Sequence, residues 1–280
     1  MKKLIALFLC LILSVCMLAS CGSAADKQSV DAIKKNGKLV VYTNAEFAPF
    51  EYLADGKAVG VDMDISKAIA DELGVELVIE NVKFDTIISS VQSGKASMGA
   101  AGITVTDERK ESVDFSISYT TSTQYVILPK DATFNNINDL AGKEIGVQLG
   151  TTGDFIISDE VNGYKDDDGK DVKGVLQDTG AKVTTYNNAN LAAEALKSGK
   201  IQAVVIDKLP AELIAKNSGD TLQAVKLVYD DGSDTAESYA ICVAKNNKSL
   251  LEVVDKVIQK LLDEGKIDEF IVNHTTNALA

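Results

Sequence analysis

The chain of 280 residues is poor in several residue types, and each scarcity excludes a class of function. It has no tryptophan, one histidine and, among 28 basic residues, one arginine. Because the histidine, His274, stands near the C-terminus, far along the chain from every candidate below, no Ser-His-Asp set and no metal cluster is evident. The excess of acidic residues, 41 against 28 basic ones, argues against nucleic acid and anionic membrane surfaces as partners.

Cysteine is also scarce, and its placement argues against a structural disulfide. Three of the four cysteines fall within the first 21 residues. The fourth, Cys242, lies in the apolar run 239–243, which predicts a buried thiol in a strand. A mature chain that begins at a lipidated Cys21 has no second thiol to pair with Cys242.

The first 20 residues predict a secretory signal peptide. Two lysines precede an apolar run over 4–19, and the small residues Ala19 and Ser20 come directly before Cys21. This ending resembles a bacterial lipobox, which implies cleavage before Cys21, lipid on its thiol and an extracytoplasmic location on the cell membrane. An ordinary signal peptide that ends beside a cysteine is the alternative. We expect residues 21–35 to form a lipidated, flexible tether, and no later segment has the roughly 20 apolar residues of a membrane span.

Strand-like and helix-like patterns alternate along the remaining chain. This alternation predicts an α/β fold with a mostly parallel sheet flanked by helices. The predicted strands are 38–43, 75–80, 96–103, 143–149, 181–186 and 201–206, and the predicted helices are 62–73, 84–91, 152–161, 190–196, 209–216 and 249–263. Two similar units, 91–95 and 196–200, each end a helix with glycine before an apolar strand, which indicates two lobes of similar build or a chance repeat of a common connection.

Two charged residues follow the strands of these units. Arg109 comes after the predicted strand 96–103, beyond the carboxyl end of a parallel strand, where open α/β sheets bind ligands. Arginine binds a carboxylate through two parallel hydrogen bonds, which lysine cannot imitate. Asp207 ends the strand of the second unit and is suited to accept a ligand ammonium group. The pair predicts a zwitterion site, with a surface ion pair for Arg109 and helix capping by Asp207 as the alternatives.

Two further segments are candidates for the same site. Residues 148–153 join a strand to a helix, so their backbone N–H groups can hold an anion, unless Thr151 or Thr152 only caps the helix. The spacing matches no phosphate loop. The loop 42–52 is rich in aromatic residues, which either seal an edge of the core or form an apolar wall for a ligand.

The segments 43–50, 59–64, 101–110 and 114–116 resemble the polar amino-acid binding proteins of ABC importers, solute-binding protein family 3. The resemblance covers about residues 36–273, and the stretch Gly-Ile-Thr-x-Thr-x-x-Arg from Gly102 is its most specific part. It implies the two-lobed, type II periplasmic-binding-protein fold. The expected parts are lobe 1 at 36–118 and 240–277, lobe 2 at 124–234, and crossing hinge strands near 118–123 and 235–239.

The resemblance also implies residue roles. Arg109 and the N–H groups of Thr104 and Thr152 would hold the α-carboxylate, while Asp207, the Thr104 hydroxyl and the Gly102 carbonyl would take the α-ammonium. Two rings would sandwich the ligand side chain. The expected ligand-binding residues are Asn44, Glu46, Phe47, Phe84, Gly102, Thr104, Arg109, Gln148, Thr151, Thr152 and Asp207.

The far end of the expected pocket departs from the family pattern. Asn44 stands where the family usually has aspartate, and Gln148 stands where glutamine-binding relatives can have lysine. Both changes remove charge from the pocket. Together with Glu46 they predict a ligand with a polar or basic side chain.

The resemblance implies that a monomeric protein without cofactor or metal closes on its amino acid and delivers it to an ABC permease in the membrane. A sensor subunit that binds the same ligand is one alternative. An enzyme resembling cyclohexadienyl dehydratases is another. Such an enzyme needs a positioned acid or base, and Glu46 is the only nominee near the pocket.

Overall fold

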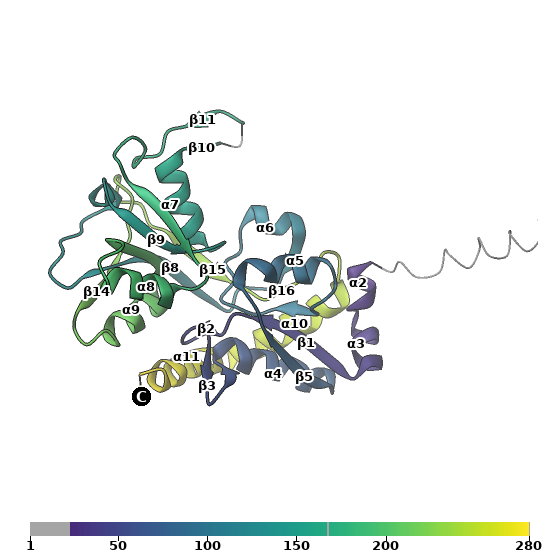
Figure 1. The fold of residues 1–280 in the computed structure, drawn as a ribbon. Helices are drawn as coiled ribbons and strands as arrows, with labels where there is room; N and C mark the ends of the chain where they lie inside the picture. The colour runs from purple at the N-terminus through teal and green to yellow at the C-terminus, as the bar shows by residue number, and fades with distance from the viewer. Residues whose placement is uncertain (1–22, 167, 280) are drawn as a thin grey trace, which may run out of the picture.

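The computed structural model describes residues 23–166 and 168–279, so the predicted signal peptide and Cys21 lie outside the described residues. The chain builds two lobes, each organised around its own sheet, and Figure 1 shows them side by side. Within the described ranges, no helix combines the length and apolarity that crossing a bilayer demands.

The first lobe has a five-stranded sheet in the order β5-β1-β6-β16-β7. Its strands are β1 (Lys38–Thr43), β5 (Glu76–Asn81), β6 (Met98–Gly99), β7 (Val113–Phe115) and β16 (Cys242–Ala244). A small sheet beside it holds β2 (Glu46–Phe47), β3 (Glu51–Ala54) and β4 (Lys57–Val59). The helices are α2 (Ala24–Lys27), α3 (Val30–Asn36), α4 (Val61–Leu73), η2 (Phe84–Thr86), α5 (Ile87–Gln92), α6 (Asp107–Ser112), α10 (Lys248–Asp263) and α11 (Lys266–Asn277).

Side chains that alternate along β16 explain why both faces of this sheet are covered. Val243 packs with α4 and α10 in one hydrophobic cluster, while Cys242 and Ala244 pack with α5 in another. The prediction of a buried strand thiol at Cys242 is therefore confirmed, and burial raises the pKa of that thiol to about 12. The thiol is inert at physiological pH.

The second lobe has the sheet order β12-β9-β13-β8-β14. Its strands are β8 (Thr120–Pro129), β9 (Glu144–Gln148), β12 (Lys182–Tyr186), β13 (Ala203–Asp207) and β14 (Leu222–Lys226), with a separate hairpin of β10 (Tyr164–Lys165) and β11 (Asp171–Val172). The helices are η3 (Ile137–Leu140), α7 (Thr152–Asn162), α8 (Ala189–Lys197) and α9 (Lys208–Lys216). β13 is buried along its whole length, because α7 covers one face of the sheet while α8 and α9 cover the other.

Both sheets are mixed, whereas the sequence predicted mostly parallel ones. The strands β5-β1-β6 run parallel, and so do β12-β9-β13, as βαβ connections require. The remaining partners, β16 and β7 in one lobe and β8 and β14 in the other, pair antiparallel. β8 lacks the apolar, helix-flanked pattern by which the parallel strands are recognised, since it begins with five polar residues.

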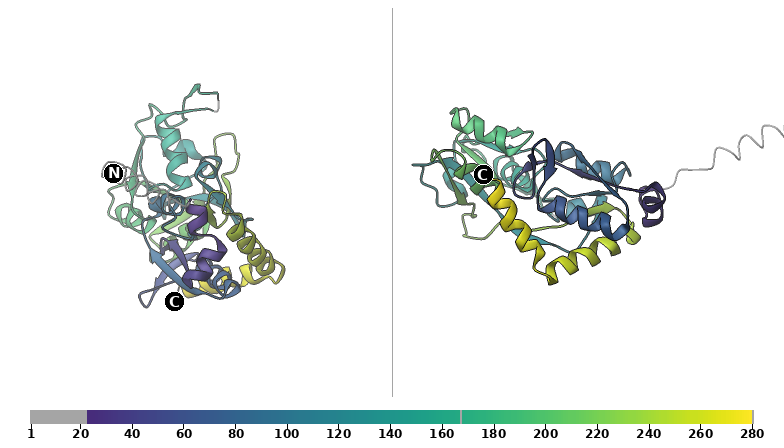
Figure 2. Two further views of the ribbon diagram at one scale, coloured as in Figure 1. Left: turned by 90° about the vertical axis from the view of Figure 1, so that its right-hand side faces the viewer. Right: turned by 90° about the horizontal axis from the view of Figure 1, so that it is seen from below.

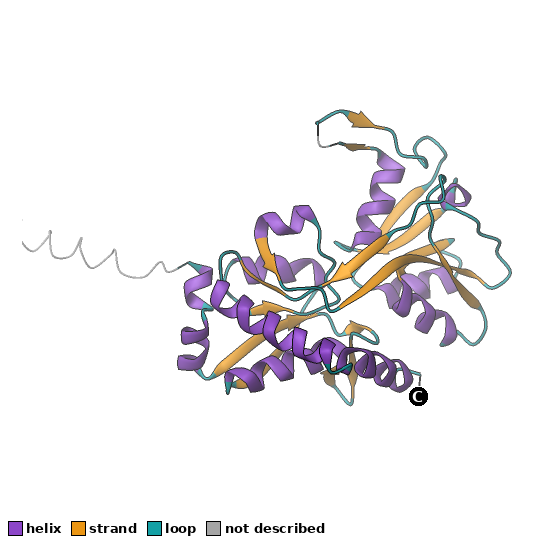
Figure 3. Cartoon of the chain, turned by 180° about the vertical axis from the view of Figure 1, so that it is seen from behind, coloured by secondary structure: helices purple, strands orange, loops and turns teal. Residues whose placement is uncertain are grey.

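Two strands connect the lobes. β8 passes from the first lobe into the second, and β15 (Ala236–Tyr239) returns beside it, paired antiparallel with Glu237 opposite Ser122. Figure 3 shows these strands running through the waist of the molecule. The hinge role that the sequence predicts for these segments stays a prediction.

The described part of the predicted tether is folded. α2 begins after a capping box formed by Ser23 and Asp26, and Ile33 of α3 is buried. The side-chain amide of Gln28 donates to the Gly94 carbonyl over 2.8 Å, and the Gln28 backbone carbonyl accepts from the Asn247 side chain at 2.7 Å. The expectation of a flexible linker over 21–35 is wrong from residue 24 on, because these capping and apolar residues attach the segment to the first lobe.

The two similar helix–glycine–strand units take the same local structure. Gly94 and Gly199 both have φ near +74°, and the next N–H in each unit returns to the carbonyl five residues earlier. The strands that follow differ, because the predicted strand 96–103 is only β6, two residues long. The chain leaves the sheet after Gly99 and turns at Gly102, whose φ is +54°.

The C-terminal helices return along the first lobe. α10 and α11 pack on α4, and Figure 2 shows them extending along one side of the molecule. The only histidine, His274, lies between Asp64 of α4 at 2.9 Å and the Tyr52 hydroxyl of β3 at 3.1 Å. His274 thus docks the last helix, away from the candidate site.

Candidate functional site

A small cavity lies between the lobes, where the strands of both sheets end. Its walls contain nine of the eleven residues that the sequence predicts for ligand binding. The lining residues are Phe47, Phe84, Gly102, Thr104, Arg109, Gln148, Thr151, Thr152 and Asp207. Asn44 contacts one of them, and Glu46 lies elsewhere.

Arg109 is buried at the first-lobe side of the cavity, with 7% of its surface exposed. It is the third residue of α6, which begins because the Thr106 side chain caps it by accepting from the Arg109 N–H at 3.1 Å. Its guanidinium donates to the carbonyls of Thr104 at 2.7 Å and Gly150 at 2.9 Å. The second contact reaches the other lobe. The surface ion pair considered as an alternative is absent, because Arg109 has no carboxylate within salt-bridge distance among the described residues.

The electrostatic surroundings of Arg109 are those of a buried cation. Burial lowers its pKa, and the negative charges of Glu237 and Asp207 act in the opposite direction. The guanidinium also lies 5.6 Å from the Phe84 ring centroid and 5.9 Å from that of Phe155. Two aromatic faces thus help to hold a charge that water does not reach.

Asp207 lies at the second-lobe side. It occupies the N-cap position of α9, but its side chain makes no capping hydrogen bond. Its carboxylate instead accepts from the Tyr239 hydroxyl at 2.5 Å. Burial raises the pKa of Asp207 well above its usual range, and the charge of Glu237 raises it further. Such a carboxyl group gains most from a cationic partner.

The N-terminus of α7 forms another wall. Thr151 is its N-cap, and the Thr151 side chain accepts from the Asp154 N–H at 3.2 Å. The capping role considered for Thr151 is therefore real. It coexists with a place in the cavity wall, since Thr151 and Thr152 both line the cavity. The free N–H groups of the first turn give this wall a positive character.

The apolar wall comes from Phe47, whose ring packs against Gly102. A side chain at Gly102 would meet the Phe47 ring at 2.8 Å and would need a positive φ, so this position requires glycine. Phe50 packs edge-on against Tyr239, with centroids 5.0 Å apart. The aromatic loop thus serves both predicted purposes, because Phe47 lines the cavity and Phe50 seals the core.

A hydrogen bond joins the lobes at the far end of the cavity. The Gln148 amide nitrogen donates to Asn44 Oδ1 at 3.1 Å, while the Asn44 amide nitrogen donates to the Val82 carbonyl at 2.8 Å. This chain of donors leaves Gln148 Oε1 as a buried acceptor with no partner among the described residues. Asn44 and Gln148 therefore lie together, as the sequence predicts.

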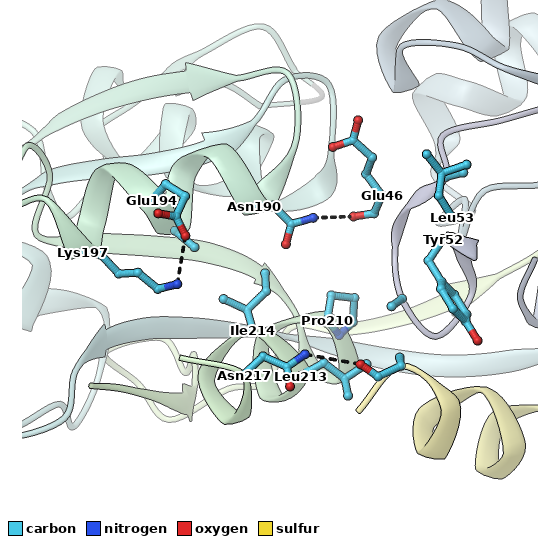
Figure 4. A pocket seen from close by; sticks show the side chains of 14 residues that line it. Glu46, Tyr52, Leu53, Asn190, Glu194, Lys197, Pro210, Leu213, Ile214 and Asn217 are labelled. Atoms are coloured by element: carbon cyan, nitrogen blue, oxygen red, sulfur yellow. Dashed lines mark hydrogen bonds and ion pairs between the residues drawn. The ribbon is translucent and has the colours of Figure 1, made fainter. Parts of the chain in front are cut away.

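Glu46 does not line this cavity. It pairs with Tyr52 in the β2–β3 hairpin, and because side chains alternate along a strand, Phe47 faces inward while Glu46 faces outward. Figure 4 shows Glu46 in a second, outer pocket with Asn190, whose amide donates to the Glu46 carbonyl over 3.4 Å. The expectation that Glu46 contacts the ligand is corrected accordingly, and with it the only nominee for a catalytic acid or base leaves the site.

Three residues behind the Asp207 side of the cavity were not predicted from the sequence. Glu237 and Tyr239 come from β15, and Gln124 comes from β8; all three are buried. They belong to the crossing strands, which pair with each other although they are far apart in sequence. The signal available in the sequence was a glutamate, Glu237, within a short polar stretch. Among the described residues, no group of three or more metal-ligating side chains gathers anywhere.

Comparison with known proteins agrees with this geometry. Residues 39–276 match the family of bacterial extracellular solute-binding proteins, family 3. The chain belongs to this family. It is 29% identical to the arginine-binding extracellular protein ArtP of Bacillus subtilis over 96% of both chains, and 31% identical to a probable histidine-binding protein of Campylobacter jejuni over the same shares.

Solved structures of solute-binding proteins share the fold. The substrate-binding protein AbpA of an amino acid ABC transporter from Streptococcus pneumoniae, bound to L-arginine, superimposes with a TM-score of 0.78 and 36% identity. The match covers 89% of this chain and 99% of that one. The family 3 chain described here therefore has the two-lobed periplasmic-binding-protein fold that the sequence predicts.

Proposed function

We propose that this family 3 protein captures a basic or polar amino acid outside the cytoplasm and delivers it intact to an ABC importer. The observation that carries the proposal is the interlobe cavity, with Arg109 and Asp207 buried in the same small space. A zwitterion offers both groups an opposite charge, and the low polarity of the surroundings strengthens each pairing.

The α-carboxylate is assigned to Arg109 and the N-terminus of α7. Arg109 keeps N–H donors after serving two carbonyls, and the first turn of α7 adds backbone donors. The α-ammonium is assigned to Asp207, with the Thr104 hydroxyl and the Gly102 carbonyl as additional acceptors. Phe47 and Phe84 are assigned to the side chain of the ligand.

The end of the cavity at Gln148 favours a ligand whose side chain donates hydrogen bonds. Gln148 Oε1 is a buried acceptor in need of a donor, and no cation lines that end of the cavity. Guanidinium, ammonium and imidazole groups supply such donors. Names of relatives, which include arginine-, histidine- and cystine-binding proteins, agree with this class. L-Arginine is therefore the first probe.

Delivery requires the lobes to open and close around β8 and β15, which we assign as the hinge. Micromolar capture needs about 8 kcal/mol of net binding free energy, which two desolvated charge pairs and an apolar wall can supply. The closed form would dock on the permease. Lipid on Cys21 would keep the protein, as a monomer, at the membrane surface beside it.

A ligand screen tests this function. Thermal unfolding of the protein with each of the twenty L-amino acids and L-cystine should show a marked rise in Tm for basic or polar ligands, because a ligand that binds only the folded state stabilises it. Mass spectrometry should recover the bound amino acid unchanged. A ligand converted to product would favour an enzyme instead, and no stabilisation by any of the amino acids would reject the proposal.

The anchor has its own test. Cells that express the full chain and are fed radiolabelled palmitate should incorporate label into the protein, and the Cys21→Ser variant should not. Equal label in both variants would rule out attachment at Cys21.

A further inference from the structure

Glu237 stands behind the ammonium side of the cavity without lining it. It is on β15, where Glu237 and Tyr239 share the buried face because side chains alternate along the strand. Tyr239 donates to Asp207, which lines the cavity. One face of a crossing strand therefore supports this whole side of the site.

Both oxygens of Glu237 are occupied by protein donors. The Thr104 hydroxyl donates to Oε2, and the Gln124 amide nitrogen donates to Oε1. Gln124 is the register partner of Asp207 across β8 and β13. Glu237 thus connects a cavity residue of the first lobe with the strand pair that carries the second-lobe anion.

This arrangement determines the hydrogen-bonding polarity of Thr104. A carboxylate can only accept, so the single hydroxyl proton of Thr104 is committed to Glu237. What Thr104 then presents to the cavity is lone pairs. A ligand group at this place must donate, as an ammonium group does and a methylene group cannot.

We propose that Glu237 is a positioning residue that holds the Thr104 hydroxyl as an acceptor and so makes the site select ligands that carry an α-ammonium group. The proposal rests on the proposed amino-acid function and adds the structural origin of this selectivity. Glu237 acts through Thr104 and adds a negative charge near Asp207 and Arg109.

The variant Glu237→Gln should reverse the hydrogen-bonding polarity of the Thr104 hydroxyl. Its oxygen would continue to accept from Gln124, so its amide nitrogen would face Thr104 and donate. The Thr104 proton would then turn toward the cavity and oppose an ammonium group. L-Arginine should bind about tenfold or more weakly, the scale of one hydrogen bond to a charged group.

The decisive comparison uses 5-guanidinopentanoic acid, which is arginine without its ammonium group. Glu237→Gln should change the Kd of this analogue by less than about twofold. Calorimetry should therefore find that the variant has lost most of the preference for L-arginine over the analogue. Thr104→Val should weaken L-arginine similarly, and the double variant should be no weaker than either single one, because both changes remove the same interaction. Glu252→Gln, the same chemical change at an exposed position of α10, is the matched control and should have no effect.

Each outcome decides the question. Wild-type protein that binds no amino acid would overturn the proposed function and this inference together. Wild-type binding with an unchanged Glu237→Gln variant, or an equal loss for both ligands, would overturn the inference alone. If Glu237→Gln does not fold, Glu237→Asp withdraws the carboxylate from Thr104 by one methylene and should give the same selective loss.

Discussion

The guanidinium of Arg109 has five N–H donors, and the carbonyls of Thr104 and Gly150 take two of them. Three donors remain for a ligand carboxylate. A lysine has three donors in all, so after serving both carbonyls it keeps only one. It cannot form the two parallel bonds by which arginine holds a carboxylate.

We expect Arg109→Lys to weaken L-arginine binding about 10- to 100-fold, the equivalent of about 1.5–3 kcal/mol. Calorimetry of both proteins measures this directly. Lys110→Ala on the same helix is the control, because Lys110 is exposed and pairs only with Asp107. A lysine variant that binds like the wild type would refute the two-bond assignment.

Asp62 supports the cavity from behind and titrates in an accessible range. It is fully buried and accepts from the Gly102 N–H at 2.9 Å and the Tyr119 hydroxyl at 2.7 Å. Burial raises its pKa to about 6 from an ordinary 3.8, although both hydrogen bonds lower it. Since the folded protein holds this proton more tightly, Asp62 contributes stability that is complete below about pH 4 and is lost as pH rises through 6.

In the variant Asp62→Asn, the side chain at position 62 cannot ionise, so this dependence of stability on pH should be absent. The free energy of unfolding of the variant relative to the wild type should rise between pH 4 and pH 7 by up to about 3 kcal/mol. Urea titrations over this range measure the difference, in which acids that do not interact with Asp62 cancel. A flat difference for Asp62→Asn would contradict the account.

Among the secondary-structure elements, we expect α6 to have the most direct effect on binding. It is six residues long and carries Arg109, and its start depends on the capping bond from Thr106. Thr106→Ala should cost about 1 kcal/mol of stability and also weaken L-arginine binding, because the arginine loses its fixed position. Thr106→Ser keeps the capping oxygen and should retain both properties. Melting temperature and Kd, measured on the three proteins, test this; equal values for the alanine and serine variants would show that the cap is irrelevant.

The βαβ elements could be predicted from sequence because their hydrophobic period and their residue types indicate the same structure. The predicted bounds of β1 are the observed ones. Those of β9, α7, α8 and α9 were predicted to within one residue at each end. The pattern failed where the residues are polar yet buried. β8 and β15 carry Gln124 and Glu237 inward, and these residues are stabilised there by each other and not by an apolar core.

The site could be predicted in part for the same reason. Arg109 and Asp207 follow recognisable strands, so their place at the sheet edge was evident. The outward direction of Glu46 was not, because a two-residue strand shows no alternation in sequence. α11 was also missed, since its apolar side is short and only one of its residues, Ile267, is buried.

At the scale of the whole molecule, contacts between the lobes define the closed arrangement. Gln148 bonds to Asn44 inside the cavity, and Asn190 bonds to the Glu46 carbonyl outside it. The Asn217 amide also donates to the Ala278 carbonyl over 3.3 Å, which links α9 to the C-terminal end of the chain. Lobe opening would have to break these three hydrogen bonds and the one from Arg109 to the Gly150 carbonyl.

L-Arginine should therefore shorten the distance between the lobes. Spin labels on cysteines at the exposed positions Leu53 and Leu191, in a mature chain with serine at position 21, report this distance by electron paramagnetic resonance. The native Cys242 is buried and should not react. A pair at Leu53 and Val272, within the first lobe, should keep its distance. An unchanged distance between the lobes would argue against hinge closure.

The central claim is that one cavity holds both charged ends of an α-amino acid. Calorimetric titration of the wild-type protein with L-arginine and with agmatine, which is arginine without its carboxylate, tests it most directly. We predict one binding site for L-arginine and at least about 100-fold weaker binding of agmatine, because Arg109 and α7 lose their partner. Binding of agmatine as tight as that of L-arginine would contradict the account.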